Sequence, residues 1–414
     1  MIKNTGPLKG LRILDMSRIL AGPTCTQILG DLGADIIKIE RPGIGDDTRN
    51  WGPPFVKDSE KNDTSESAYY LCSNRNKRSL SLDITKKEGQ KILRGIAEKC
   101  DVLIENYKVG SLKRYGLDYS TMKLDFPNLI YCSISAFGQT GPKSHRLGYD
   151  FMIQAMGGIM SVTGEPEGMP MKVGVGIADV MCGMYAAISI LAAVNHRLES
   201  DNTEKSGNGQ YIDLSLYDSQ TAWLINSGLN YLISGENQYR LGNAHPNLVP
   251  YKIFQSSDNF FVLAIGNDIQ FQKFCEFAGV PELSYDLRFK SNKERVKNRK
   301  ILEQMISDLT KRNSTQFWLR GLEKIQVPCG PVNTIKEVFD DEQIKHREME
   351  ISLPYPVSGD GKVSLIGSPI KMSETPVSYR NAPPTLGQHT NEILSEILGM
   401  NEAKCRDLAR KGII

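Results

Sequence analysis

The stretch "LRILDMSRILAGPTCTQILGDLGADIIKIE", Leu11 to Glu40, decides the fold class. It predicts a short apolar strand, a turn, a helix and a second strand, "DIIKIE". The same alternation continues through "SLSLDI", "EGQKILRGIAEKC", "DVLIENY" and "LIYCSIS". This rhythm is typical of βαβ units, so we expect an α/β fold with a Rossmann-like parallel sheet. Ligands of such sheets bind at the carboxyl ends of the strands, so the informative residues should follow these runs directly.

Two other regions differ from this rhythm. The segment from about Leu248 to Asn313 predicts a smaller α+β unit, with strands "YKIFQ" and "FFVLAIG" followed by helices. The polar segment Arg197 to Gly209 has the composition of a linker or exposed loop, and Lys57 to Ser67 that of a flexible surface loop.

Composition limits the function classes. The 414 residues suggest two or three domains, and 50 Lys plus Arg against 48 Asp plus Glu give a net charge of +2. This balance argues against a general nucleic-acid or membrane-surface role. The apolar run Met184 to Val194 is about half the length that crosses a bilayer, so we expect a buried helix there.

Cysteine and histidine usage points to a reducing compartment without a metal site. The eight cysteines form no CxxC pair, and the five histidines form no HxxxH or HxH pair. A strand-like run begins almost at once, which leaves no room for a signal or transit peptide in this chain. We expect a cytoplasmic protein, or a mitochondrial matrix protein if a presequence has been removed.

Several common active-site motifs are missing. The turn Ser17 to Pro23 carries one glycine instead of GxGxxG, and neither a P-loop nor a GxSxG elbow occurs. Glu40 ends the second strand where a ribose-binding acid would lie, but Arg41 follows it at once. An arginine there suits a phosphate, although a surface arginine paired with a nearby acid is an equal alternative.

Basic residues recur just after the predicted strands, which favours an anionic, phosphate-rich ligand. They are Arg18, Arg41, Arg49, Arg75, Lys77, Arg78, Arg114 and Arg146. Asn106 and Tyr107 close the strand "DVLIENY", where an amide and an aromatic ring could bind a base. An ordinary strand-end turn is the simpler alternative for these two residues.

The stretch "MKVGVGIADVMCGMYAA", Met171 to Ala187, places Asp179 between glycines and a small-residue helix. One interpretation is an N-cap, because a carboxylate accepts a hydrogen bond from an unpaired N–H at a helix start. The other is an ionised nucleophile, which the helix dipole would keep deprotonated and open to substrate.

Motifs along almost the whole chain resemble those of the class III CoA-transferases, the CaiB/BaiF or formyl-CoA transferase family. The resemblance covers Leu8 to Arg49, "NRNKRSLSLD", "DVLIENY", "AFGQTGP", "GYD", "VGIADVMCGMYA", "GNAHPNLVPY", "VPCGPVNT" and "LGQHT", in family order. It implies that Asp179 attacks an acyl-CoA to form a mixed anhydride, and that the CoA thiolate then forms an aspartyl-CoA thioester. An acceptor carboxylate then replaces the acid that has left, and the same steps in reverse give the new acyl-CoA. CoA thioesters would be substrates, with no permanently bound cofactor.

The resemblance also implies residue roles. Leu20 and Ala21 would line the CoA pocket beside the nucleophile, and Tyr149 and Asp150 would border the acyl site. Contacts to the adenine and phosphates would come from Arg41, Leu82, Asn106, Tyr107 and Arg114, with Arg146 a further contact to CoA.

Departures from the family pattern bear on the substrate. Leu20 replaces the Gln of some formyl-CoA transferases, and their extended glycine loop is absent near Arg240 to Tyr251. Both weaken an oxalate or formate assignment and leave Asn243 and His245 as candidates for acceptor binding. "GDDTRNWGPPF", "YYLCSNRNKRS" and "AHPNLVPY" are most similar to the succinyl-CoA:glutarate (hydroxymethylglutarate) group, which suggests a dicarboxylic acid acceptor.

Two alternatives remain open. The α-methylacyl-CoA racemases share the fold but have a His at the position of Tyr149, and a phenol is a poor replacement for imidazole in moving protons at neutral pH. A non-catalytic CoA-binding protein is the third hypothesis.

The resemblance implies a large domain built from both chain ends and an interlocked homodimer. We expect the N-terminal part of the CoA-binding domain over 1–200, a linker and helix over 201–235, and a small domain over 236–325. Residues 326–414 would form a linker and a C-terminal part that returns to the large domain.

Overall fold

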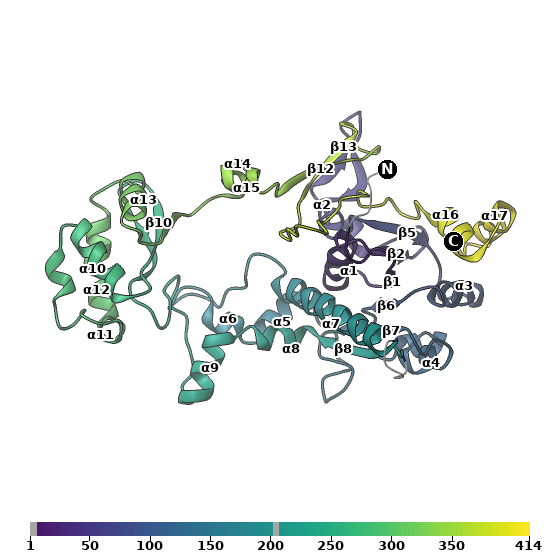
Figure 1. Ribbon diagram of the computed structural model, residues 1–414, viewed down its shortest axis with the longest axis horizontal. Coiled ribbons are helices and arrows are strands. Elements are labelled where there is room, and N and C mark those ends of the chain that lie inside the picture. The colour runs from purple at the N-terminus through teal and green to yellow at the C-terminus, as the bar shows by residue number, and fades with distance from the viewer. Residues whose placement is uncertain (1–5, 202–206) are drawn as a thin grey trace. The chain divides into compact units, whose positions relative to one another are not determined.

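The computed structural model describes residues 6–201 and 207–414. The chain forms two compact units (Figure 1). The first comprises 1–158, 173–223 and 343–414, and the second comprises 159–172 and 224–342.

A six-stranded parallel sheet forms the centre of the first unit. Its order is β5 (Lys77–Ser81), β2 (Asp35–Glu40), β1 (Arg12–Asp15), β6 (Val102–Glu105), β7 (Ile130–Ser135) and β8 (Tyr211–Ser215). The chain builds outward from β1 through β2 and β5, then returns to β6 on the other side of β1. The expected α/β fold with a parallel sheet is confirmed, and its topological switch point lies between β1 and β6.

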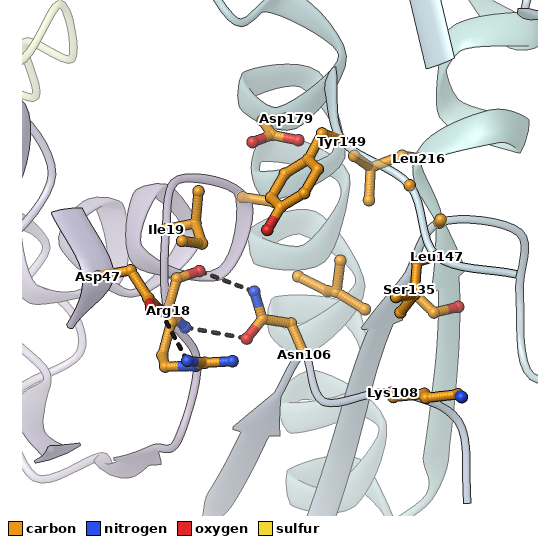
Figure 2. Close-up of a pocket in the computed structure, with 14 residues that line it drawn as sticks. Arg18, Ile19, Asp47, Asn106, Lys108, Ser135, Leu147, Tyr149, Asp179 and Leu216 are labelled. Carbon is orange, nitrogen blue, oxygen red and sulfur yellow. Dashed lines mark hydrogen bonds and ion pairs between the residues drawn. The ribbon is translucent and has the colours of Figure 1, made fainter. Parts of the chain in front are cut away.

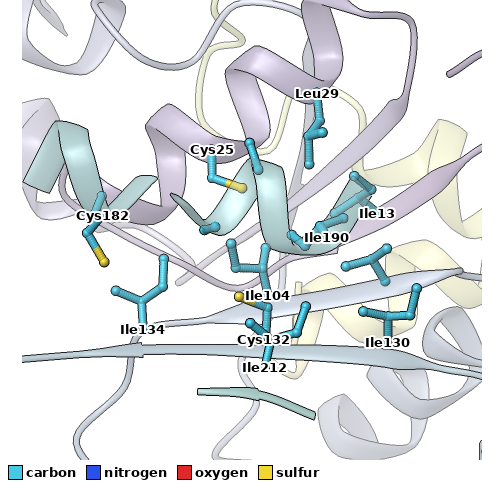
Figure 3. Packing of buried hydrophobic residues seen from close by; sticks show 14 of the residues in the cluster. Ile13, Cys25, Leu29, Ile104, Ile130, Cys132, Ile134, Cys182, Ile190 and Ile212 are labelled. Atoms are coloured by element: carbon cyan, nitrogen blue, oxygen red, sulfur yellow. The ribbon is translucent and has the colours of Figure 1, made fainter. Parts of the chain in front are cut away.

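Alternating side chains bury both faces of this sheet. Ile13 packs with α1 (Ala21–Asp31) and α7 (Ile177–Asp201), while Leu14 packs on the opposite face. That second face is covered by α3 (Lys87–Ala97), α4 (Tyr119–Asp125), α16 (Thr390–Leu398) and α17 (Glu402–Arg410). Figure 3 shows Cys25, Cys132 and Cys182 in the first cluster, between the helices and the sheet.

Helix α1 packs closely against α7 near the start of both helices. A Cβ atom added at Gly183 would lie 2.4 Å from the carbonyl oxygen of Ala21 and 3.0 Å from the Cβ of Thr24. Only glycine therefore fits at this crossing. Because Gly183 lies one turn after Asp179, the contact holds the start of α7 beside the start of α1.

Helix α7 is more apolar than its central run alone suggests. The window Ile177–Leu198 is long and apolar enough, by length and composition, to cross a membrane, and half of it is buried in the protein. Cys182, Ala186 and Ile190 belong to the cluster between α7, α1 and the sheet. These contacts are those of a core helix.

The second unit contains a three-stranded antiparallel sheet of β9 (Tyr251–Gln255), β10 (Phe260–Ala264) and β11 (Cys329–Pro331). Its main helices are α10 (Asp268–Phe277), α11 (Asn292–Lys297), α12 (Arg299–Thr310) and α13 (Thr315–Lys324). An aromatic core with Phe274 and Trp318 joins them. The expected smaller α+β unit is confirmed. The shorter α6 (Ile159–Val162), α9 (Ile225–Ser234), α14 (Ile335–Asp340) and α15 (Glu342–His346) also occur, with α15 at the boundary of the units.

Two expected loops are wrong in part. Lys57 to Ser67 contains β4 (Asp63–Ser67), which pairs with β3 (Phe55–Lys57) as a hairpin. Arg197 to Asp201 still belongs to α7, and Arg197 forms an ion pair with Asp101. Residues 202–206 of the expected linker lie outside the described residues.

The remaining elements of the first unit are short: η1 (Asp47–Asn50), α2 (Ala68–Leu71), η2 (Ser111–Tyr115), α5 (Asp150–Met156), α8 (Leu216–Ala222), and the hairpin of β12 (Glu350–Pro354) and β13 (Lys362–Ile366).

Candidate active site

A cavity of about 330 Å³ lies in the first unit at the carboxyl ends of β1, β6 and β7 (Figure 2). It is therefore at the topological switch point, where ligands of such sheets bind. Its volume is at the lower end of the range of small-molecule sites. The lining comprises Arg18, Ile19, Ala21, Asp47, Asn106, Lys108, Ile134, Ser135, Ala136, Leu147, Gly148, Tyr149, Asp179 and Leu216.

Asp179 is the buried carboxylate of this cavity. It is the third residue of α7 and only 7% exposed. In the described part of the chain, its carboxylate accepts no hydrogen bond and forms no ion pair. Burial, and then repulsion by Asp150, raise the pKa of Asp179 to about 7. The expected ionisation by the helix dipole is thus outweighed by desolvation.

Asp150, rather than Asp179, satisfies the start of α7. Its Oδ1 accepts a hydrogen bond from the Ala178 N–H at 2.8 Å, and its Oδ2 accepts one from Gln154 Nε2 at 2.7 Å. Gln154 Oε1 accepts the Val173 N–H at 2.9 Å, which fixes the segment that leads to α7. The N-cap interpretation of Asp179 is therefore wrong, because Asp179 lies inside α7 and Asp150 accepts the N–H at its start.

Asn106 clamps the turn after β1. Its Oδ1 accepts the backbone N–H of Arg18 at 2.9 Å, and its Nδ2 donates to the Arg18 carbonyl at 2.7 Å (Figure 2). The amide thus mimics a strand partner and joins the ends of β1 and β6. The Arg18 guanidinium pairs with Asp47 at 2.6 Å and lies 5.7 Å from the ring centroid of Tyr107.

The cavity brings together five of the residues expected from the sequence: Arg18, Ala21, Asn106, Tyr149 and Asp179. Tyr149 is 65% exposed and points into the cavity beside Asp179 (Figure 2). Leu20 and Asp150 lie next to this set, because a Cβ atom added at Gly176 would lie 2.9 Å from Leu20 Cδ2 and 3.7 Å from the Asp150 carboxyl carbon.

The other expected residues are outside this lining. Arg41 is exposed after β2, and Leu82 is buried after β5, where its N–H bonds the Glu40 carbonyl. Arg114 lies over the ring of Tyr115, and Arg146 over that of Phe137. Tyr107 borders a neighbouring cavity of about 290 Å³ that shares Lys108 with the first.

Four of the basic residues expected to contact an anion instead form internal ion pairs, and that interpretation is wrong for them. Arg49 bonds Glu40 and Glu66, Arg75 bonds Asp31, Lys77 bonds Asp15, and Arg78 bonds Asp35, at 2.6 to 3.3 Å. Three of the four cations are buried. A buried charge must be paired, so these carboxylate partners account for the cations without a ligand.

Sequence reasoning missed nine of the lining residues as members of the site, among them Ile19, Asp47, Lys108 and Ser135. Lys108 follows the strand end "IENY", so the rule used for Asn106 would have found it. Among the described residues, the Ser135 hydroxyl has no hydrogen-bond partner. Tyr69 also lies within electrostatic range of Asp179, because burial and then the charge of Asp179 raise the pKa of Tyr69 to about 12.

Asn243 and His245 lie in the second unit, on the segment before β9. His245 packs against Tyr251, and its Nδ1 accepts the Asn247 N–H at 3.0 Å. Burial and the nearby Arg299 lower the pKa of His245. Within the described residues, no group of three or more His, Cys, Asp or Glu could hold a metal ion.

Comparisons with known proteins agree with this geometry. The model of "CoA-transferase family III" matches residues 8–390. The succinate–glutarate CoA-transferase of Agrobacterium fabrum is 44% identical over 392 residues, which cover 94% of this chain and 96% of that protein. The succinyl-CoA:glutarate CoA-transferase of Homo sapiens is 41% identical over 413 residues, which cover 100% and 91%.

The fold is similar to that of a CaiB/BaiF family protein from Brucella suis. Its crystal structure has a TM-score of 0.82 at 44% identity, covering 95% of this chain and 100% of that one. The family resemblance noted in the sequence is confirmed. The chain belongs to CoA-transferase family III and is an enzyme of that class.

Proposed function

We propose that this enzyme transfers CoA from succinyl-CoA to glutarate through covalent intermediates on Asp179. One observation carries the proposal: a buried carboxylate without a hydrogen-bond partner among the described residues lies in the cavity at the switch point. Two relatives that are 41% and 44% identical over nearly the whole chain are named for this donor and acceptor.

The first half-reaction conserves the acyl energy. A carboxylate oxygen of Asp179 attacks the succinyl thioester carbonyl, and the C–S bond breaks to give a mixed anhydride and the CoA thiolate. The thiolate then attacks the aspartyl carbonyl, which releases succinate and leaves an aspartyl-CoA thioester.

The second half-reaction repeats these steps in reverse. A glutarate oxygen attacks the aspartyl thioester, which expels the thiolate and forms an aspartyl–glutaryl anhydride. The thiolate attacks the glutaryl carbonyl, and glutaryl-CoA leaves with Asp179 restored as a carboxylate. No proton or co-reactant is consumed, and CoA enters and leaves as part of the substrate.

The site supplies three requirements of this chemistry. Burial of Asp179 limits access of water to the anhydride. The absence of hydrogen bonds from described residues leaves its oxygens free to attack. Among the described residues, no side chain accepts a capping hydrogen bond at the start of α1, and the first residue of this helix, Ala21, lines the cavity. Backbone N–H groups at this helix start can therefore stabilise a developing oxyanion.

The remaining site assignments are part of the same proposal. Leu20, Tyr149 and Asp150 would border the acyl group. CoA contacts would come from Arg41, Leu82, Asn106, Tyr107, Arg114 and Arg146. Support comes from the position of these first-unit residues at the carboxyl ends of strands and in the loops that follow.

We further propose an interlocked homodimer in a reducing compartment, either the cytoplasm or the mitochondrial matrix. Helix α9 exposes Ile225, Leu229, Leu232 and Ile233, an apolar surface that a second copy would cover. All eight cysteines are free thiols, which supports the compartment. Light scattering after size exclusion would measure the mass of the particle.

A coupled assay tests the function. The wild type is incubated with succinyl-CoA and glutarate, and glutaryl-CoA is measured beside Asp179→Asn and the exposed control Asp360→Asn. We expect loss of transfer by at least 1000-fold in Asp179→Asn and wild-type rates in the control. Epimerisation of a 2-methylacyl-CoA without transfer would favour the racemase, and CoA binding without either reaction would favour a binding protein.

A further inference from the structure

The turn after β1 contains a backbone conformation that its residue type disfavours. Ile19 has a φ of +72°, in the left-handed region. This region is a genuine outlier for a β-branched residue, because Cβ crowds the backbone there. Ile19 also lines the cavity of Asp179. Strained residues persist only where the surrounding structure fixes them, and they concentrate at functional sites.

Three polar anchors fix this turn. Asp15 Oδ1 accepts the Ser17 N–H at 2.9 Å. Asn106 binds both backbone groups of Arg18, as described above. Asp46 Oδ1 accepts the Ile19 N–H at 3.2 Å.

A buried lysine braces the last of these anchors. Lys38 Nζ donates to Asp46 Oδ2 and to the Ser17 carbonyl, both at 2.9 Å. The side chains of Lys38 and Asp46 are fully buried. A charge pair of this kind is costly to desolvate and serves geometry more than stability. It therefore joins the two ends of the strained turn through one rigid connection.

The turn separates two side chains that face different parts of the site. Before Ile19, the Arg18 guanidinium lies between Asp47 and the ring of Tyr107. After it, Leu20 lies against Gly176, beside Asp150. The positive φ at Ile19 turns the chain between these two directions.

We propose that Ile19 is a positioning residue: its strained conformation, held by Lys38 and Asp46, fixes Arg18 and Leu20 so that a CoA thioester lies in register with Asp179. This inference rests on the proposed function. A small misplacement of bound reactants costs orders of magnitude in rate, so a loosened turn should slow transfer without unfolding the protein.

Two substitutions separate strain from side-chain loss. Ile19→Ala and Ile19→Gly both remove the side chain, but only glycine relieves the strain at positive φ. We expect the Gly variant to have a Tm about 2 °C or more above that of the Ala variant. At positions with negative φ, the Ala variant would instead be the more stable of the two.

Activity should follow the opposite order. At equal folded fraction, we expect Ile19→Gly to lower kcat for CoA transfer about tenfold or more and to weaken CoA binding several-fold, and Ile19→Ala to lose less of both. Lys61→Gly is the matched control, because Lys61 has a φ of +65° in the exposed turn between β3 and β4. It should gain stability and keep wild-type kcat.

Wild-type kcat and CoA affinity in Ile19→Gly would overturn the inference, as would an Ala variant more stable than the Gly variant. If the wild type itself fails to transfer CoA from succinyl-CoA to glutarate, the proposed function fails. CoA affinity, measured by calorimetry, then still decides the inference, because a Gly variant with wild-type affinity refutes it.

Discussion

Replacing Asp179 with Asn should stabilise the protein while abolishing transfer. Burial and Asp150 raise the pKa of this carboxyl from its ordinary 3.8 to about 7 in the folded chain. The folded state thus binds the proton more tightly than the unfolded state does. Ionisation of Asp179 therefore opposes folding, by an amount that grows as the pH rises from about 4 to about 7 and then stays constant.

The rise in the pKa of Asp179 determines how large this effect on stability is. The rise of the Asp179 pKa from 3.8 to about 7 corresponds to about 4 kcal/mol at pH 8, because each tenfold change in proton affinity is worth about 1.4 kcal/mol. At pH 5, where the folded carboxyl is still protonated, the cost is about 2 kcal/mol. Asp179→Asn removes the ionisable group, so its advantage over the wild type should grow by about 2 to 3 kcal/mol between pH 5 and pH 8.

Urea unfolding at pH 5, 6, 7 and 8 measures this difference directly, with Asp360→Asn as the control for loss of one exposed carboxylate. The control should stay within about 0.5 kcal/mol of the wild type. An Asn variant whose stability advantage is the same at pH 5 and pH 8 would contradict this prediction, because it would show that Asp179 titrates alike in the folded and unfolded states.

Three further predictions concern the ionisation of Asp179, the crossing of α1 and α7, and the ion pairs of Arg49. The value of kcat/KM for succinyl-CoA should rise about tenfold from pH 6 to pH 8, as Asp179 ionises with a pKa of about 7, and a flat pH profile would contradict this. Gly183→Ala should cost about 1 to 3 kcal/mol in unfolding, because its Cβ would meet the Ala21 carbonyl at 2.4 Å, whereas Gly330→Ala, with no neighbour within 4 Å, should cost little. Arg49→Met should lower the free energy of unfolding by about 3 to 5 kcal/mol, because it leaves the buried carboxylates of Glu40 and Glu66 unpaired. The folded fraction of this variant should keep its CoA affinity in calorimetry. Weaker CoA binding without a loss of stability would show that Arg49 contacts the ligand.

The fold could be predicted because its signals are local. The strand "DIIKIE" is β2 residue for residue, since alternating apolar side chains cover both faces of the sheet. Asp179 could be named as a candidate site residue from a family motif, and Asn106 from its position directly after β6. These inferences need only the order of residues along the chain.

The electrostatics of the site could not be predicted, because they depend on distant partners. Arg49 is neutralised by Glu66 and also donates to the carbonyl of Pro384, far along the chain. The pKa of Asp179 depends on Asp150, which arrives on α5. The strain at Ile19 has no sequence signal either, since a positive φ is not expected for a β-branched residue.

Nucleophilic catalysis by Asp179 is tested most directly by intact-protein mass spectrometry after incubation with succinyl-CoA, an acidic quench and peptide mapping. We expect a CoA-sized adduct on the peptide that contains Asp179, present in the wild type and absent in Asp179→Ala. The glutarate acceptor should discharge it. A CoA adduct on another residue, or turnover without any adduct in the wild type, would contradict nucleophilic catalysis by Asp179.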